Sequence, residues 1–433
     1  MSLPRVLVST VPSWNSIDNT FSSLFQDYDK TKLSCLYIRA DKSDSQSCDR
    51  YFHIYEGRVL KSILDRNIIT GEEYVLTDDD RKASLNDSEE VMTESNRYNF
   101  FRGFYSYTFY LIRELIWLLG RWNTKELNKF VDSVDPEVFI FPIESYIHLD
   151  RINEYIIKKK RPRKVIGFLW DDNFTYRQHP YNLSYRLHRF WLCRHVRRLV
   201  SQCDTIFVLS PKMKSECDAE FGTDSVLLTK PIFNNGKYEY NGPQNPLRML
   251  YTGTMLIGRD KTILNVSDAI CRVNAQGTRV VLDIYSDTVL PHTMKQKIEK
   301  GGFCTIHGRI SQTEVLEKQK QADILLFVES LSGKNLTARL SFSTKLTDYF
   351  SAGRCIWAVG NEDLGPIEYL RNNDSGLVST DIRSLNNTLD RIVAAPEIVE
   401  EYARKSFDCG IKNHDADSIL KRFRDEIVNS EKI

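Results

Sequence analysis

Short apolar runs alternate with amphipathic segments along most of the chain. Continuous apolar runs of this kind are typical of parallel strands that are covered on both faces. They occupy residues 5–10, 33–38, 138–141, 165–170 and 204–210, and again residues 247–251, 280–285, 303–308, 324–328 and 355–359. Segments of helical periodicity separate most of them, an alternation that predicts the α/β class. Two such series indicate two Rossmann-like, doubly wound domains that face each other across a cleft.

Turn-forming residues cluster between the two series. Asn-Asn-Gly at 234–236 and Asn-Gly-Pro at 241–243 mark a linker with few apolar residues. We therefore expect an N-terminal domain over residues 1–235, a C-terminal domain over 236–412 and a terminal helix over 413–433. The polar stretch from 41 to 99 shows no periodic pattern, and we interpret its acidic run at 78–80 as a solvated loop.

Composition narrows the class of protein. The 433 residues include 59 basic and 58 acidic side chains, so the net charge of +1 gives no reason to expect a nucleic-acid partner. Nine cysteines without a C-x-x-C pair are typical of reduced thiols in a cytoplasm. The first apolar run is too short for a signal peptide, and no run of about 20 apolar residues exists. We expect a cytoplasmic protein, with contact at the inner face of the plasma membrane left open.

The most informative stretch runs from residue 322 to 360. A buried strand over 324–328 is followed by Glu329, in the place where ligands bind in open α/β sheets, beyond the carboxyl ends of strands. Ser343, Thr344 and Lys345 stand at a loop-to-helix transition, where free backbone N–H groups favour a phosphate. A short helix then ends at Gly353, and a second buried strand follows.

The motif S-T-K-L-x-D-Y-x-x-A-G at 343–353 resembles the donor-site motif of GT-B glycosyltransferases. It is most similar to the large retaining family (group 1, GT4-like) of bacterial polysaccharide biosynthesis, where the motif often reads S-K-L-x-E-Y-x-A-A-G-x-P-V. The acidic residue that holds the donor's ribose in that family corresponds to Asp348, which is one methylene shorter than Glu. A second family Glu falls at Leu340, and Glu329 is the candidate for its role.

The resemblance extends to the start of the C-terminal domain. Gly253 follows the strand at 247–251, where a family glycine lets the backbone approach the donor. Arg259 and Lys261 stand where the family has a basic pair on the donor diphosphate, and fixed cations stabilise the charge that grows on a leaving diphosphate. The resemblance implies a nucleotide-sugar as substrate, no cofactor and no metal. It also implies that the terminal helix packs back on the first domain.

Candidates on the acceptor side are fewer. Trp14 and Asn15 follow the first strand, although we favour a packing role for Trp14. Asp171 and Asp172 follow the strand at 165–170, near a position where related enzymes carry a His or Asp facing the transferred sugar. We name them as catalytic candidates. A helix-capping role for this pair remains the alternative.

Two segments raise the question of membrane contact. Residues 104–119 are apolar apart from four positions, which predicts a buried helix or, alternatively, a helix at a membrane interface. Residues 183–200 form a basic helix with five arginines and no acid, with Phe190 and Trp191 among them. Such a face suits anionic lipid headgroups or a lipid pyrophosphate, and a solvated face is the alternative.

The resemblance implies transfer of a hexosyl group from a nucleotide-sugar to a carbohydrate or lipid-linked carbohydrate acceptor, with retention of configuration, in cell-surface polysaccharide biosynthesis. Two other functions stay open. The same fold serves sugar-nucleotide 2-epimerases, which need no acceptor. A catalytically silent membrane-surface binding subunit is the other, favoured only by the apolar residue at position 340. The pattern G-x-G-x-x-G is absent, which argues against a nicotinamide or flavin enzyme.

Overall fold

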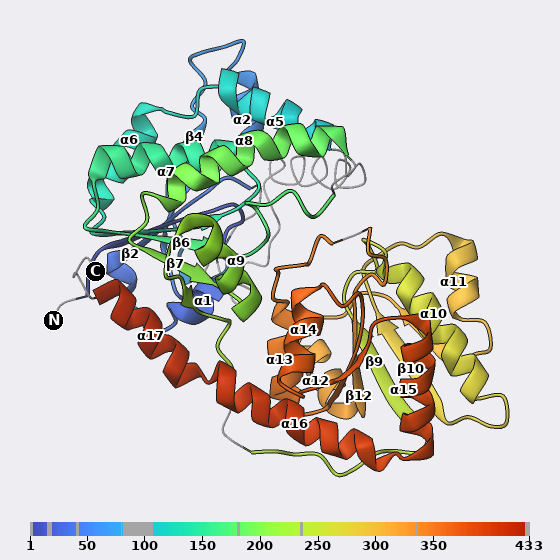
Figure 1. Cartoon of the computed structure of the whole chain (residues 1–433). Helices are drawn as coiled ribbons and strands as arrows, with labels where there is room; N and C mark the ends of the chain where they lie inside the picture. The colour runs from blue at the N-terminus through green and yellow to red at the C-terminus, as the bar shows by residue number, and fades with distance from the viewer. Residues whose placement is uncertain are drawn as a thin grey trace.

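The computed structural model consists of two α/β domains, each built on one largely parallel sheet (Figure 1). It describes residues 3–14, 20–39, 43–78, 80, 107–179, 182–233, 237–334 and 336–428. The first sheet belongs to the N-terminal half of the chain and the second to the C-terminal half. The α/β class with two doubly wound domains, predicted from the apolar runs, is confirmed.

The N-terminal sheet has eight strands in the order β4-β3-β2-β1-β5-β6-β7-β8. Only the β3–β4 pair is antiparallel. Because β1 pairs with both β2 and β5, the strand order reverses between β1 and β5, the kind of position where such sheets bind ligands. The strands are β1 (Val6–Thr10), β2 (Leu33–Tyr37), β3 (Arg50–Ile54), β4 (Gly71–Val75), β5 (Val138–Ile143), β6 (Lys164–Leu169), β7 (Thr205–Val208) and β8 (Val226–Leu227).

Helices cover both faces of this sheet. One apolar core lies between the sheet and α2 with α5 to α9, and a second lies between the other face and α1. The helices are α1 (Thr20–Leu24), α2 (Glu56–Lys61), α5 (Tyr107–Leu119), α6 (Lys125–Val134), α7 (Ile147–Lys160), α8 (Leu183–Val200) and α9 (Pro211–Phe221), with a 3-10 turn at Lys30–Lys32. The bounds of α8 match the basic helix predicted from sequence.

The C-terminal sheet has six parallel strands in the order β11-β10-β9-β12-β13-β14. The strand order here reverses between β9 and β12. The strands are β9 (Leu247–Thr252), β10 (Val280–Tyr285), β11 (Cys304–His307), β12 (Ile324–Val328), β13 (Cys355–Val359) and β14 (Leu377–Ser379). The helices are α10 (Arg259–Val273), α11 (His292–Ile298), α12 (Gln312–Gln321), α13 (Thr344–Ala352), α14 (Gly365–Asn372), α15 (Ile382–Ala394), α16 (Glu397–His414) and α17 (Ala416–Val428).

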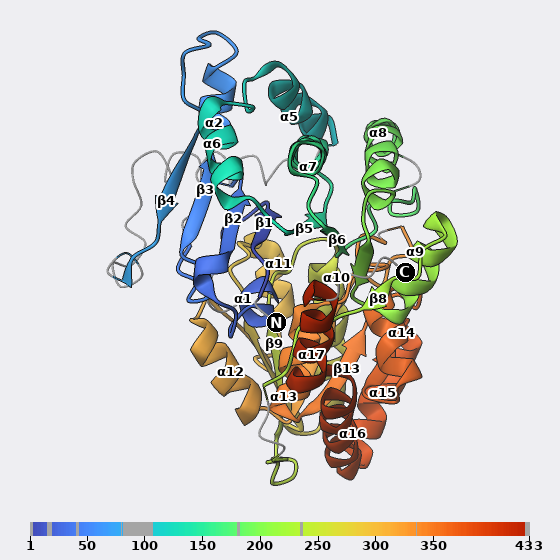
Figure 2. The same ribbon diagram turned by 90° about the vertical axis from the view of Figure 1, so that its left-hand side faces the viewer.

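The last helix returns to the first domain. α16 packs on α13 and β13 of the C-terminal domain, and α17 then runs along the N-terminal domain toward the first residues of the chain (Figures 1 and 2). Phe423 of α17 is fully buried there, with its ring 5.0 Å from that of Phe25 and 6.0 Å from that of Phe207. The chain therefore crosses between the domains twice, after β8 and again between α16 and α17.

The two crossings are joined by hydrogen bonds at His414. The backbone N–H of Ile232 donates to the carbonyl oxygen of His414 at 2.8 Å. The imidazole lies 2.8 Å from the hydroxyl of Thr229 through Nδ1 and 3.0 Å from that of Tyr369 through Nε2. Burial lowers the pKa of His414 to about 4, because a charged ring would lose its water here. The ring is therefore neutral in the folded protein at pH 7.

We expect His414 to make the protein less stable in mild acid. The unfolded histidine takes up a proton near pH 6.5 and the folded one near pH 4, so between these values the unfolded state binds more protons. Stability is then complete above about pH 6.5 and declines as the pH falls, by roughly 2 kcal/mol at pH 5. Urea unfolding at pH 8 and pH 5 would measure this. His414→Gln should reduce the difference between the two pH values by that amount, and an unchanged difference would contradict the assignment.

The N-terminal half contains elements that the sequence did not predict, and one prediction about it was wrong. The polar stretch at 41–99 contains β3, α2 and β4, and the two strands form one edge of the sheet. In addition, α5 is not a buried helix: among its residues with described side chains only Trp117 is fully buried, and much of its outward surface is apolar and exposed. Part of the predicted apolar segment, residues 104–106, lies outside the described residues.

Candidate functional site

The residues predicted to bind the donor gather where the C-terminal sheet reverses its strand order. Gly253 directly follows β9, and Glu329 directly follows the adjacent strand β12. Arg259 is the first residue of α10, which leaves the same edge of the sheet. Since ligands of such sheets bind beyond the carboxyl ends of strands at this reversal, the predicted residues occupy the expected place.

Arg259 and Glu329 form a two-pronged ion pair. Arg259 donates from Nε to Oε2 of Glu329 at 3.0 Å and from Nη2 to Oε1 at 2.8 Å. Its Nη1 also donates to the Thr254 hydroxyl at 3.2 Å. The two charged side chains are only 17% and 7% exposed. Paired N–H···O bonds of this kind fix the plane of a guanidinium, so Arg259 is held in one orientation at the sheet edge.

Lys345 adds a second positive charge beside this pair. Its Nζ lies 3.4 Å from the carbonyl oxygen of Thr252 and 5.3 Å from the centre of the Tyr251 ring. Burial lowers the pKa of Lys345 to about 8, repulsion by Arg259 contributes, and Glu329 opposes the shift. Two cations and one carboxylate leave the cluster with an excess positive charge, which favours an anionic ligand.

Gly253 makes room for this lysine. Its backbone has a φ of 133°, an angle that residues other than glycine rarely adopt. A Cβ at this position would lie 2.7 Å from Nζ of Lys345. Glycine is thus required both by the backbone angle and by the close approach of the ammonium group.

We expect Gly253→Ala to lower the free energy of unfolding by roughly 1–3 kcal/mol through backbone strain, and to push the Lys345 ammonium toward water. The pKa of Lys345 should then rise from about 8 toward its ordinary value, measured by the pH dependence of acylation of that lysine. Gly277→Ala is the matched control, because Gly277 has a φ of 137° but open space around it. Equal behaviour of Lys345 in both variants would show that Gly253 does not position it.

The other residues predicted to bind the donor do not contact the cluster of Arg259, Glu329 and Lys345 through any bond described for it. Ser343 is the N-cap of α13 without a side-chain capping bond, and Thr344 is exposed at the first position of that helix. Lys261 is exposed on α10 and, within the described parts of the chain, its side chain makes no hydrogen bond or ion pair. Asp348 forms an ion pair at 3.0 Å with Lys230, which lies between β8 and β9, so a ribose would have to compete with that lysine.

On the N-terminal side, Asp172 is enclosed. It is fully buried and accepts hydrogen bonds from the backbone N–H of Thr175 at 3.0 Å and from the Thr175 hydroxyl at 2.5 Å. Arg339 of the other domain donates to its second oxygen at 2.8 Å. Asp172 therefore closes a turn of the loop after β6 and forms an ion pair between domains; it does not cap a helix, because α8 begins only at Leu183 and has Asn182 as its N-cap.

Asp171 lies at the same strand end but keeps an exposed surface. It accepts a hydrogen bond from the hydroxyl of Ser341 in the C-terminal domain. The surrounding protein removes water from the carboxylate, and this desolvation raises the pKa of Asp171 above its ordinary range. The hydrogen bond from Ser341 opposes the rise. Trp14 is fully buried and stacks on Phe21, which confirms the packing role. Asn15 lies outside the described residues.

Sequence reasoning missed Glu144, which directly follows β5. Its side chain is half-buried, and the end of β5 adjoins the end of β6, which leads to Asp171. Burial raises the pKa of Glu144 to about 7, and repulsion by Asp171 adds to the rise. The same signal that identified Asp171, a carboxylate just past a buried strand, was available for Glu144.

A short loop joins the two domains at this point. We call residues 336–341, between β12 and α13, the latch loop. Arg339 links Asp172 to Glu216, whose Oε2 lies 2.6 Å from Nη2 of Arg339. Leu340 is fully buried in the core of the N-terminal domain. Thr337 accepts a hydrogen bond at 3.0 Å from Gln178. The family that this sequence resembles has Glu at position 340. Here the residue is apolar because it packs in the core of the N-terminal domain.

Comparisons identify the fold. No protein-family model matches the chain, and neither does any curated protein sequence. Among solved structures, HepE (Alr3699) of Anabaena in complex with UDP and glucose matches with a TM-score of 0.59 at 8% identity, over 96% of this chain and 97% of that one. TarM matches with 0.58 at 8% identity, over 98% and 99%. The lipopolysaccharide outer core galactosyltransferase WaaB, in its apo form, matches with 0.56 at 13% identity, over 98% and 99%. The chain has the GT-B fold.

Proposed function

We propose that the protein is a glycosyltransferase that moves a hexosyl group from a nucleotide-sugar to a carbohydrate or lipid-linked carbohydrate acceptor. We further propose that it retains the anomeric configuration, needs no metal and acts in cell-surface polysaccharide biosynthesis. The observation that carries the proposal is the cluster of Arg259, Glu329 and Lys345 at the strand-order reversal of the C-terminal sheet. HepE, a structure of the same fold, is described in complex with UDP, which makes UDP the first diphosphate to test.

The cluster suits a leaving diphosphate. Arg259 would bind phosphate oxygens with its planar fork, and Lys345 would supply a point charge beside it. The first N–H groups of α13, at Ser343 and Thr344, offer a further phosphate contact. Bound phosphate would return the pKa of Lys345 from about 8 toward its ordinary value, since a nearby anion favours the protonated form.

The proposed reaction uses these two cations. The bond between the anomeric carbon and the diphosphate oxygen breaks, and the electron pair leaves with the nucleoside diphosphate, whose growing charge the two cations stabilise. A hydroxyl of the acceptor forms the new bond on the same face of the sugar and gives its proton to the departing phosphate. Asp348 and Lys261 are assigned to the donor, with Glu329 as the residue that orients Arg259 and the sugar.

The acceptor side is assigned to Asp171 and Glu144. Both are carboxylates at adjacent strand ends of the N-terminal sheet, and each is partly accessible. They would accept hydrogen bonds from sugar hydroxyls. Asp172 contributes indirectly, because its ion pair with Arg339 fixes the latch loop that carries Ser341.

A thermal-shift panel of UDP, GDP and ADP, each with Mg²⁺ or with EDTA, tests the donor site. A ligand at a hundred times its dissociation constant should stabilise the protein by roughly 2.7 kcal/mol. Stabilisation by one diphosphate, equal with and without metal, is the expected result. No response to any diphosphate would overturn the donor site.

A turnover assay separates transfer from the alternatives. With the matching nucleotide-sugar, a transferase releases nucleoside diphosphate only when an acceptor extract is added. Interconversion of the nucleotide-sugar without an acceptor would identify a 2-epimerase instead. Diphosphate binding without any turnover in either assay would favour the silent binding subunit.

A further inference from the structure

The outward face of α8 carries large apolar side chains. Leu183, Leu187, Phe190 and Trp191 are 83%, 51%, 55% and 52% exposed. Their positions fall on one side of the helix, while the residues that hold α8 to the domain lie on the opposite side and are buried: Tyr185, Leu192, Val196 and Leu199. The buried side of α8 therefore already packs on the domain, and the exposed side chains form a second, separate apolar face that packing within the domain does not explain.

Positive charge accompanies this second face. Four of the five arginines of α8 are exposed, and the helix contains no acidic residue. Arg197 and Arg198 reach Glu220 and Glu154, respectively. The side chains of Arg186 and Arg194 form no ion pair or hydrogen bond with any residue that the structure describes. The fifth, Arg189, was expected on the surface but is 2% exposed, because it turns inward to Gln178.

α5 extends the apolar surface. Ile112, Leu115, Leu118 and Leu119 are between 49% and 57% exposed, and they recur on one side of the helix. The charged residues of α5 turn away from that side, Arg113 to Glu56 at 2.5 Å and Glu114 to His148 at 2.9 Å. α5 packs against α8, and the two helices lie together on the side of the N-terminal domain away from α17 (Figure 1).

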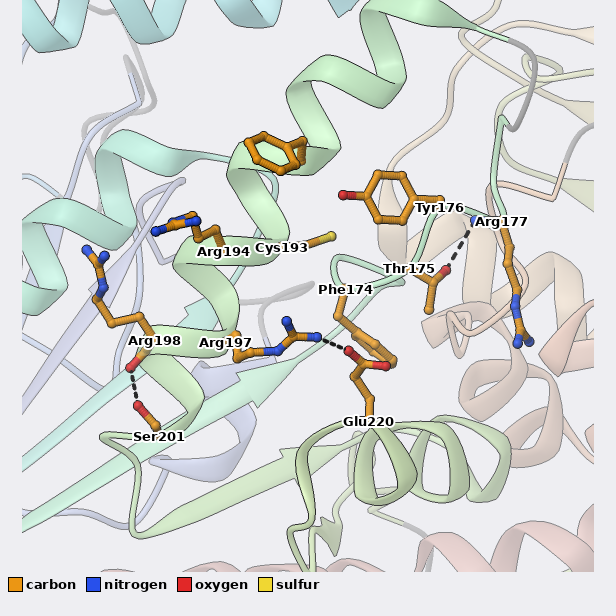
Figure 3. Close-up of a pocket in the computed structure, with 11 residues that line it drawn as sticks. Phe174, Thr175, Tyr176, Arg177, Cys193, Arg194, Arg197, Arg198, Ser201 and Glu220 are labelled. Atoms are coloured by element: carbon orange, nitrogen blue, oxygen red, sulfur yellow. Dashed lines mark hydrogen bonds and ion pairs between the residues drawn. The ribbon is translucent and has the colours of Figure 1, made fainter.

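A groove runs beside α8. It has a volume of about 880 Å³ and lies between α8, α9 and the loop after β6 (Figure 3). Arg177, Arg194 and Arg197 line it together with Phe174, Tyr176 and Phe190. Glu220 is paired with Arg197, so the lining keeps an excess of positive charge. Cations above aromatic walls suit a phosphate group that is attached to an apolar body.

We propose that α5 and α8 dock this protein on the surface of an anionic lipid bilayer. The exposed leucines, Phe190 and Trp191 enter the boundary between headgroups and acyl chains, and Arg186 and Arg194 bind lipid phosphates, with a headgroup seated in the groove. An amphipathic helix with arginines beside Trp and Phe is the arrangement that binds such a boundary. Charge complementarity selects an anionic surface, since α8 carries five arginines and no acidic residue while the whole chain has a net charge of only +1.

The docked orientation has a consequence for the proposed transfer reaction. The segment that leads into α8 touches the latch loop, through Gln178 and His179 on Thr337. The N-terminal end of α8 thus begins next to the contact between the domains. If the chain is a transferase with a lipid-linked acceptor, a docked protein holds that contact near the membrane. Docking itself does not depend on the donor site.

Vesicle co-sedimentation of the full chain tests the proposal. We expect binding to phosphatidylcholine vesicles that contain phosphatidylglycerol, little binding to pure phosphatidylcholine, and loss of binding at high salt. Arg186→Ala and Arg194→Ala should each weaken binding about fivefold, and Phe190→Ser with Trp191→Ser should abolish it. The control is Ile382→Ser with Arg383→Ala, a pair on the C-terminal domain in which Ile382 is 56% exposed, and it should bind as the unmodified protein does.

A second measurement stays valid if the double serine variant does not fold. Brominated anionic lipids should quench tryptophan fluorescence, and the conservative variant Trp191→Phe should lose most of that quenching. Equal binding to neutral and anionic vesicles, no binding to either, equal loss in the control pair, or unchanged quenching in Trp191→Phe would each overturn the proposal. So would a dimer in light scattering that the double serine variant dissociates, because the face would then bind a second copy.

Discussion

Replacing Arg259 with alanine is expected to lower turnover of the nucleotide-sugar by roughly 100- to 1,000-fold, the usual cost of removing one fixed donor from a developing negative charge. The guanidinium is oriented in advance by Glu329, with contacts of 3.0 and 2.8 Å, and needs no rearrangement as the diphosphate departs. The same change should remove most of the thermal stabilisation by nucleoside diphosphate. Steady-state kinetics and thermal shift measure the two effects.

Two controls isolate the role of Arg259. Arg272→Ala changes the same residue type in the last turn of the same helix, where the side chain pairs with Asp390 and is 47% exposed, and it should keep full activity. Arg259→Ala with Glu329→Gln removes the carboxylate that the single variant leaves unpaired, so any loss that stems from instability should be reversed. If the double variant recovers activity, or if Arg272→Ala is equally inactive, Arg259 is not the diphosphate ligand.

Replacing Arg339 with alanine is expected to lower the free energy of unfolding by about 3–5 kcal/mol, the range for breaking a buried ion pair on one side. Arg339 and Asp172 are 5% and 0% exposed, and the variant leaves the carboxylate of Asp172 buried without its cation. Glu216 would lose the same partner. Because these bonds join the two domains, we also expect the domains to separate more readily, which limited proteolysis of the latch loop would detect.

Arg371→Ala provides the comparison. Arg371 pairs with Glu362 at 4.0 Å with both side chains about half exposed or more, so its removal should cost about 0–1 kcal/mol. Adding Asp172→Asn to Arg339→Ala removes the unpaired charge and should restore part of the stability. A small effect of Arg339→Ala, similar to that of Arg371→Ala, would show that the latch loop does not depend on this ion pair.

The sequence predicted those parts of the site in which a residue's position follows from its own strand or helix. Glu329 and Gly253 directly follow buried strands, and α8 has the bounds that the sequence predicts. In such elements each residue's place follows from its own segment, because parallel strands end at a common edge of the sheet.

Contacts between distant segments were not predictable in this way. Leu340 stands where the family that the sequence resembles has Glu. The structure explains the apolar residue, because the latch loop places Leu340 in the core of the other domain. Arg189 carries the same charge as its neighbours on α8 but turns inward to Gln178. The edge strand β4 has polar and mostly exposed positions, so a pattern of apolar residues could not reveal it. Partners far apart along the chain leave no periodic signal in either segment.

The return of the chain through α17 has a consequence for biosynthesis. The N-terminal domain includes α17, which follows the whole C-terminal domain along the chain, and Phe423 fills the core of the N-terminal domain beside Phe25. On the ribosome, the strands of this domain emerge roughly 10 to 40 s before that helix does, at ordinary rates of synthesis. During that interval one face of the sheet lacks the part of its cover that α17 provides. The nascent chain therefore presents an apolar surface to chaperones until α17 has been synthesised, although the rest of its first domain is complete.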